Sequence, residues 1–73
     1  MEKEEFKKII AYQIYKRRMD RNWTQGELAG FARLSQSSIQ FYETRVSIPT
    51  AFALRNIAEV FECSMDELCG RGE

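Results

Sequence analysis

The sequence has no histidine, a single proline and only two cysteines among its 73 residues. Without histidine the commonest general acid–base side chain is missing, and no paired carboxylates or activated nucleophile stand in its place, so we expect no enzyme. Cys63 and Cys69 have no companion ligands and make a poor zinc site, so we expect neither a metal nor another cofactor. Two such thiols are typical of a reduced, cytoplasmic protein.

The sequence also lacks a long apolar run, a signal-peptide pattern and any net charge. We therefore expect a cytoplasmic protein without a membrane partner. The charges are unevenly distributed, because residues 13–45 carry six Lys and Arg against three Asp and Glu, whereas residues 46–73 carry two against five. A locally basic segment decides attraction to a polyanion more than the total charge does, so nucleic acid is not excluded.

Helical periodicity dominates the chain, and strand signals are weak. The length suits one domain over residues 1–73, with a core of about 6–69 and frayed ends, and residues 70–73 in particular are expected to fray. The first helix is expected over residues 4–21. Its inner face holds Phe6, Ile10 and Ile14, its last turns hold Lys16, Arg17, Arg18 and Arg21, and Tyr12 and Tyr15 are expected to pack between helices.

Four further helices are predicted from their start signals. The expected caps are Thr24 with Glu27, Ser35, Thr50 after the lone Pro49, and Ser64 with Glu67. The expected inner residues are Leu28, Ala29 and Ala32, then Ile39 and Tyr42, then Leu54, Ile57, Ala58 and Phe61, and finally Met65 and Leu68. The second and third helices are separated by only three or four residues, a spacing typical of a helix-turn-helix.

The third helix has an outer face that no core requires. This face holds Gln36, Ser37, Gln40, Phe41 and Thr44. The stretch WTQGELAGFARLSQSSIQFYE, followed by IPT and LRNIAEVFECSMDEL, resembles the Cro and phage-repressor type of helix-turn-helix domain, the Xre-like family, over residues 10–68. The resemblance implies an all-α, compact five-helix bundle in which helices 2 and 3 form the helix-turn-helix and helix 3 enters the DNA major groove.

The resemblance also implies roles for individual residues. Base edges would be read by Gln36, Ser37, Gln40 and Phe41, and phosphates would be contacted by Gln25, Ser38, Thr44, Arg45 and Arg18. Arg18 would form an ion pair with Glu43, which agrees with the need of an anion at a helix C-terminus for a cationic partner. Asn22, Arg33 and Arg45 stand where relatives carry glycine, so a left-handed backbone is expected at these positions.

The sequence therefore predicts a DNA-binding transcriptional regulator. We expect a repressor that binds double-stranded DNA as a homodimer on a near-palindromic operator, with no small-molecule ligand. The alternative is a protein-interaction module on the same fold, which the zero net charge, the acidic last helices and Phe41 favour. Two further alternatives stay open at this point: the polar face of helix 3 as an ordinary solvated surface, and the basic cluster of residues 16–21 as a complement to the helix dipole.

Overall fold

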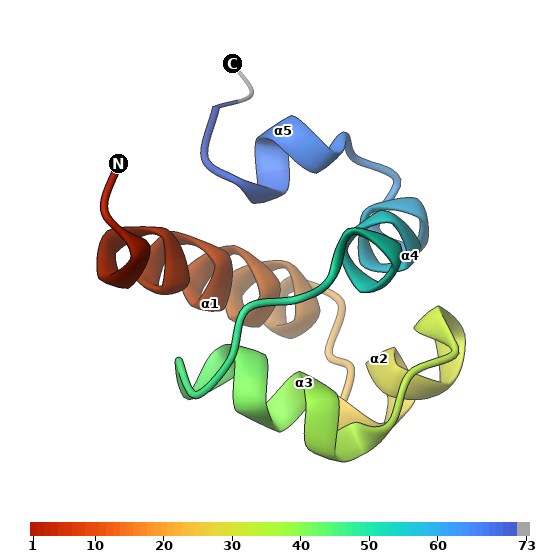
Figure 1. Ribbon diagram of the computed structural model, residues 1–73. Helices are drawn as coiled ribbons and strands as arrows, with labels where there is room; N and C mark the ends of the chain where they lie inside the picture. The colour runs from red at the N-terminus through yellow and green to blue at the C-terminus, as the bar shows by residue number, and fades with distance from the viewer. Residues whose placement is uncertain (72–73) are drawn as a thin grey trace.

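The computed structural model describes residues 1–71 and consists of five helices (Figure 1). They are α1 Lys3–Asp20, α2 Gln25–Ala32, α3 Gln36–Glu43, α4 Ala51–Phe61 and α5 Met65–Leu68. No strand occurs in these 71 residues, so the expected all-α, five-helix fold is confirmed. α1 begins and ends one residue earlier than the sequence predicts.

Four of the five helices begin at the hydroxyl caps that the sequence predicts. Thr24, Ser35, Thr50 and Ser64 each accept a hydrogen bond from the backbone N–H three residues later. Both capping boxes are closed, because Glu27 and Glu67 each accept a 2.8 Å bond from the backbone N–H of their own cap residue. A hydroxyl cap contributes about 1 kcal/mol to helix stability, so these helix starts are determined locally.

The first four helices all end at a left-handed residue that is not glycine. The residues are Asn22, Arg33, Arg45 and Glu62, with φ of 57°, 60°, 67° and 56°. After each, the next backbone N–H bonds to the carbonyl five residues earlier at 2.8–3.1 Å, which is the Schellman arrangement. The expectation for Asn22, Arg33 and Arg45 is confirmed. Glu62 was missed, because a glutamate carries no signal for this conformation.

The helices enclose one core whose fully buried side chains come from every helix. These side chains are Ile10, Ile14, Leu28, Ile39, Ile57, Phe61 and Leu68. α2 packs against α3 and α4, while α1 packs against α3 and α5. Figure 1 shows α3 and α5 on opposite sides of α1, so one face of α3 meets the core and the other lies at the edge of the molecule.

Two expectations about packing are wrong. Tyr12 and Tyr15 do not pack between helices, since they are 57% and 50% exposed. Successive helical residues are 100° apart, and this places both rings on the side of α1 away from Ile10 and Ile14. Met65 does not dock α5 either, because it is exposed, and in a helix of one turn only Leu68 reaches the core.

Directly after α5 the backbone still forms hydrogen bonds within the domain, and the fraying expected from Gly70 onward stays a prediction. The backbone N–H groups of Gly70 and Arg71 donate to Glu67 and Asp66 at 3.1 and 2.8 Å. A Cβ on Gly70 would lie 2.8 Å from Ile9 Cγ2, and the residue has φ 82°, so only glycine fits against α1 here. Residues 72–73, also expected to fray, lie outside the described residues. Between residues 1 and 71 no helix has the length and apolar character needed to cross a membrane.

Candidate nucleic-acid interface

α3 divides cleanly into a buried side and an exposed side. Ile39 is fully buried and Tyr42 is 8% exposed, and these two side chains hold the helix on the core. The exposed residues on or directly after α3 are Gln36, Ser37, Gln40, Phe41, Thr44 and Arg45, and Ser38 is half-buried. The four residues expected to read bases therefore share one solvent-facing surface.

The three polar residues on this surface have free side chains. Within residues 1–71, Gln36, Ser37 and Gln40 form no side-chain hydrogen bond, although several of their neighbours do. Their donors and acceptors are therefore available to solvent or to a ligand. A glutamine carboxamide presents a donor and an acceptor side by side, which is the arrangement that matches the N6 and N7 edge of adenine.

Gln36 lies directly over the start of α2. A Cβ built on Gly26 would lie 3.0 Å from Gln36 Oε1, so the carboxamide rests against the second residue of α2. Because Gly26 has no side chain, the carboxamide of Gln36, the first residue of α3, can occupy this space. Sequence reasoning missed this role of Gly26, because it depends on how α2 and α3 cross and not on any local pattern.

Phe41 and Val46 are two exposed apolar residues at the end of α3. Their side chains are 46% and 62% exposed, and the Val46 backbone N–H donates to the Phe41 carbonyl at 2.8 Å. Phe41 was expected on this face, but Val46 was not singled out because it falls in the predicted loop. An apolar contact of this kind suits either a thymine methyl group or another protein.

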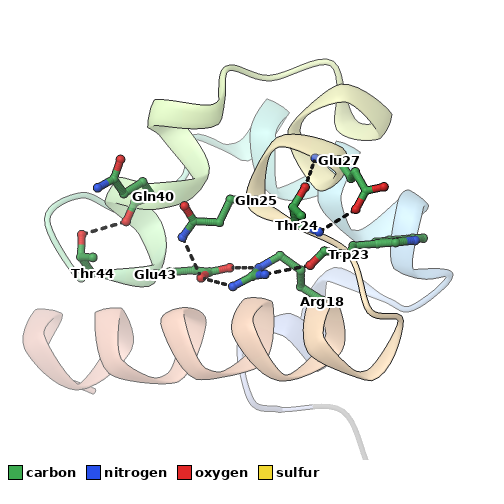
Figure 2. Close-up of polar contacts among 8 residues, drawn as sticks. All are labelled: Arg18, Trp23, Thr24, Gln25, Glu27, Gln40, Glu43 and Thr44. Carbon is green, nitrogen blue, oxygen red and sulfur yellow. Dashed lines mark hydrogen bonds and ion pairs between the residues drawn. The ribbon is translucent and has the colours of Figure 1, made fainter.

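A buried ion pair fixes α3 to α1 (Figure 2). The Arg18 Nε and Nη2 groups donate to the two Glu43 carboxylate oxygens at 2.7 and 2.9 Å, a bidentate arrangement. Arg18 Nη1 also donates to the Trp23 carbonyl at 2.8 Å, and Gln25 Nε2 donates to Glu43 Oε1 at 3.1 Å. Hydrogen bonding to Glu43 outweighs the opposing effect of burial and raises the pKa of Arg18 above its ordinary value.

This network joins α1, α2 and α3 through one carboxylate. The Arg18 and Glu43 side chains are only 10% and 6% exposed, so the pair is protected from screening by salt. The ion pair that the resemblance implies is therefore present, and Gln25 is a third member that the sequence did not indicate. The network holds the end of the exposed helix at a defined position relative to the start of α2.

The candidate phosphate contacts differ in how free they are. Figure 2 shows Gln25 bound to Glu43 and the Thr44 hydroxyl donating to the Gln40 carbonyl, which lies at 2.8 Å. The Ser38 Oγ lies 2.9 Å from the Ser35 Oγ. Arg45 is exposed and makes no side-chain hydrogen bond with residues 1–71. Direct contact with phosphate stays a prediction for all of these residues and for Arg18.

The basic cluster at the end of α1 is engaged within the domain. Lys16 lies 3.4 Å from Asp20, and Arg17 donates to Gln13 at 3.1 Å. Arg21 donates to the Phe61 carbonyl at 2.9 Å and covers the Phe61 ring at 5.0 Å. With Arg18 in its ion pair, these contacts favour the structural explanation of the cluster over a binding one.

The neighbouring aromatic and cysteine residues also have structural roles. Trp23 stacks on Phe61 at 6.0 Å and packs against the core. Cys63 and Cys69 are free and half-buried, and burial raises the pKa of both thiols. Across residues 1–71 no three His, Cys, Asp or Glu side chains lie close enough together to hold a metal ion.

Comparison with known proteins agrees with this geometry. The family model described as Helix-turn-helix matches residues 14–68. The chain is 42% identical over 50 residues to the cryptic phage CTXphi transcriptional repressor RstR of Vibrio cholerae serotype O1, and the match covers 68% of this chain but 45% of that relative. No solved structure matches. The chain belongs to the helix-turn-helix family of Cro and C1 type, which consists of DNA-binding transcriptional regulators and not of enzymes.

Proposed function

We propose that the chain is a sequence-specific transcriptional repressor that binds double-stranded DNA as a homodimer. One observation carries the proposal: α3 is fixed to the core on one side and presents free polar side chains on the other. The name of the similar phage protein, a transcriptional repressor, supports the same conclusion.

Base recognition is assigned to the exposed side of α3. Gln36 and Gln40 each match the hydrogen-bonding edge of adenine, and Ser37 can donate to or accept from several bases. Phe41 lies beside them and supplies an apolar surface that suits a thymine methyl group. Each bidentate pair contributes about 1–3 kcal/mol of discrimination against a wrong base, so a few such contacts give useful specificity.

Phosphate contacts are assigned to the ends of α3 and to the start of α2. An eight-residue helix is about 12 Å long, close to the width of the major groove, so cations at its two ends can reach both backbones. Arg33 precedes α3 and Arg45 follows it, and both are exposed. Gln25, Ser38 and Thr44 flank the same surface, and Arg18 holds the surface in place through Glu43.

The small size of the α3 surface supports the proposed dimer. One helix of eight residues contacts only a few base pairs, which is too little for a unique site in a genome. Two copies related by a two-fold axis would place their α3 helices about 34 Å apart, one turn of DNA, on a near-palindromic operator.

The proposal is tested by selecting random duplex DNA against the purified protein and titrating the selected duplex at two salt concentrations. A palindromic consensus and an affinity that falls steeply with salt are expected, because bound phosphates release counterions. Gln36→Ala should weaken binding to the selected duplex by about 1–3 kcal/mol and relax the preference at one position, while binding to random DNA stays nearly unchanged. Equal losses on both duplexes would refute the assignment of Gln36 to base recognition.

A protein-interaction module is the second candidate, and the exposed pair Phe41 and Val46 favours it. Exposed aromatic residues are enriched at protein interfaces, and a complex formed through apolar contact does not depend steeply on salt. Failure to select any DNA at low salt would favour this function over repression. Phe41→Ser would then be expected to abolish the protein complex while leaving the helices intact.

A further inference from the structure

Two grooves on the surface share the same pair of cationic side chains, Lys8 and Arg45. The larger groove, of about 470 Å³, is lined by Lys8, Ile9, Tyr12, Gln13, Arg45 and Gly70. The smaller one, of about 260 Å³, is lined by Glu4, Glu5, Lys8 and Arg45. Lys8 belongs to the second turn of α1, and Arg45 is the second residue after α3, so residues 37 positions apart in sequence line the same groove.

Neither cation is neutralised by the part of the chain that the structure describes. Residues 1–71 contain four ion pairs, formed by Lys7, Lys16, Arg18 and Arg55, and none includes Lys8 or Arg45. Both side chains are exposed, and neither forms a hydrogen bond within these residues. Two like charges held beside one groove repel each other, and an anion between them would relieve that repulsion.

Neutral donors line the same groove. The Tyr12 side chain lines the groove and is 57% exposed, and its hydroxyl can donate a hydrogen bond to an oxyanion. Gln13 accepts a bond from Arg17 with its Oε1 atom, which leaves the amide NH2 group as its free part. Cations with convergent neutral donors are the usual composition of a phosphate site.

We propose that Lys8 and Arg45 together hold one backbone phosphate of the DNA that α3 reads. The inference rests on the proposed function and adds to it a contact from the second turn of α1, at the C-terminal end of α3. The left-handed backbone at Arg45, φ 67°, turns the chain away from α3 at this point and brings the arginine to α1. The footprint on DNA then extends beyond the helix-turn-helix.

The carboxylates of Glu4 and Glu5 oppose this contact. They line the smaller groove with Arg45, and Glu4 is paired with Lys7 at 3.6 Å, so Glu5 is the one of these two acids that has no ion pair within residues 1–71. An unpaired anion beside a phosphate site lowers affinity for DNA of any sequence. Removing the charge of Glu5 should therefore strengthen binding, the opposite of removing Lys8.

The test is a salt titration of four single variants and one double variant on the selected duplex and on a random duplex. One phosphate contact changes the slope of log affinity against log salt by about 0.9, which is about a 3.5-fold change in affinity between 50 and 200 mM salt. Lys8→Gln and Arg45→Gln should each reduce the slope by up to this amount, equally on both duplexes, with the consensus unchanged. The double variant should lose about one contact in total, because both side chains hold the same phosphate.

The control is Lys16→Gln, a solvent-exposed lysine on the same helix that lies outside both grooves. It should keep the wild-type slope, and Glu5→Gln should raise affinity on both duplexes. An unchanged slope in Lys8→Gln, or a loss of two contacts in the double variant, would overturn the shared phosphate site while leaving the proposed repressor intact. A wild-type chain that binds neither duplex in a salt-dependent way would instead refute the proposed function itself.

Discussion

Removing Arg18 from its ion pair should cost a large part of the stability of the domain. Arg18→Met takes away two hydrogen bonds, at 2.7 and 2.9 Å, from a Glu43 side chain that is only 6% exposed. Only the 3.1 Å bond from Gln25 remains to that carboxylate. Breaking a buried pair in this way costs about 3–5 kcal/mol, against a total stability of about 4–11 kcal/mol for a domain of 73 residues.

Removing both charges should cost less than removing one. In Arg18→Met/Glu43→Leu no buried charge is left alone, and such replacements are often close to neutral. The Trp23 carbonyl still loses its donor, for which a penalty of about 1–3 kcal/mol is expected. The matched control is Arg55→Met, because the Arg55–Glu59 pair lies at 3.6 Å with both side chains about 65% exposed and contributes at most about 1 kcal/mol.

Urea denaturation followed by circular dichroism and by the fluorescence of the single tryptophan measures all four variants. Wild type and Arg55→Met are expected to be the most stable and about equal. The double variant should be less stable, and the single variants Arg18→Met and Glu43→Leu should be the least stable. The reasoning fails if Arg18→Met costs no more than Arg55→Met. It also fails if the double variant loses as much as the two single variants added together, because the two charges would then be uncoupled.

Three further predictions follow from single contacts. Gly26→Ala should stabilise α2 by up to about 1 kcal/mol and also displace the Gln36 carboxamide. The melting temperature of the protein should therefore rise, while its affinity should fall for the selected duplex and stay unchanged for random DNA. Glu62→Gly should raise the free energy of unfolding by up to about 1 kcal/mol in urea, because glycine suits φ 56°; a decrease would show that the end of α4 is not strained. The hydrogen bond from the Ser64 backbone N–H lowers the pKa of Glu67 below its ordinary value of 4.5, so the stability contributed by the Glu67 carboxylate is present above pH 4.5 and is lost as the pH falls. The difference in unfolding free energy between wild type and Glu67→Gln should therefore shrink on acidification. A difference that stays constant with pH would contradict the stabilising role of this carboxylate.

The elements of the fold were predictable because their signals are local. At each of four helix starts, a cap hydroxyl accepts a hydrogen bond from the backbone N–H three residues later. At Thr24 and Ser64 the residue at that position is a glutamate whose side chain bonds back to the cap residue, which completes a capping box. Helix ends were harder, since a Schellman motif needs a left-handed residue and only the last of the five uses glycine. Glu62 could not be predicted as the end of α4, because a glutamate carries no signal for a left-handed backbone. We attribute its left-handed conformation to the packing of its neighbours Phe61 and Cys63 against the core.

The candidate site was predictable in composition but not in arrangement. The polar outer face of α3 follows from helical spacing, and α3 does expose Gln36, Ser37 and Gln40. Contacts between helices do not follow from spacing, so the position of Gln36 over Gly26 and the bond from Gln25 to Glu43 were not foreseen. The same holds for Lys8, whose neighbour Arg45 is far away in sequence.

The zero net charge of the chain does not oppose binding to DNA, because the charges are separated in space. The basic side chains at the end of α1 are paired with groups within the domain, so few of their donors are free to bind a phosphate. Among the exposed cations that have no side-chain partner in residues 1–71, Arg33 and Arg45 flank α3 and Lys8 shares a groove with Arg45. Lys3 begins α1, and Arg71 follows α5, where the exposed acids Glu62 and Asp66 outnumber it, on the other side of α1 from α3 (Figure 1). If α3 reads DNA as proposed, a polyanion approaching this molecule would be attracted at the face of α3 and repelled at the face of α5, and the charge distribution would orient α3 toward the DNA before any base is contacted.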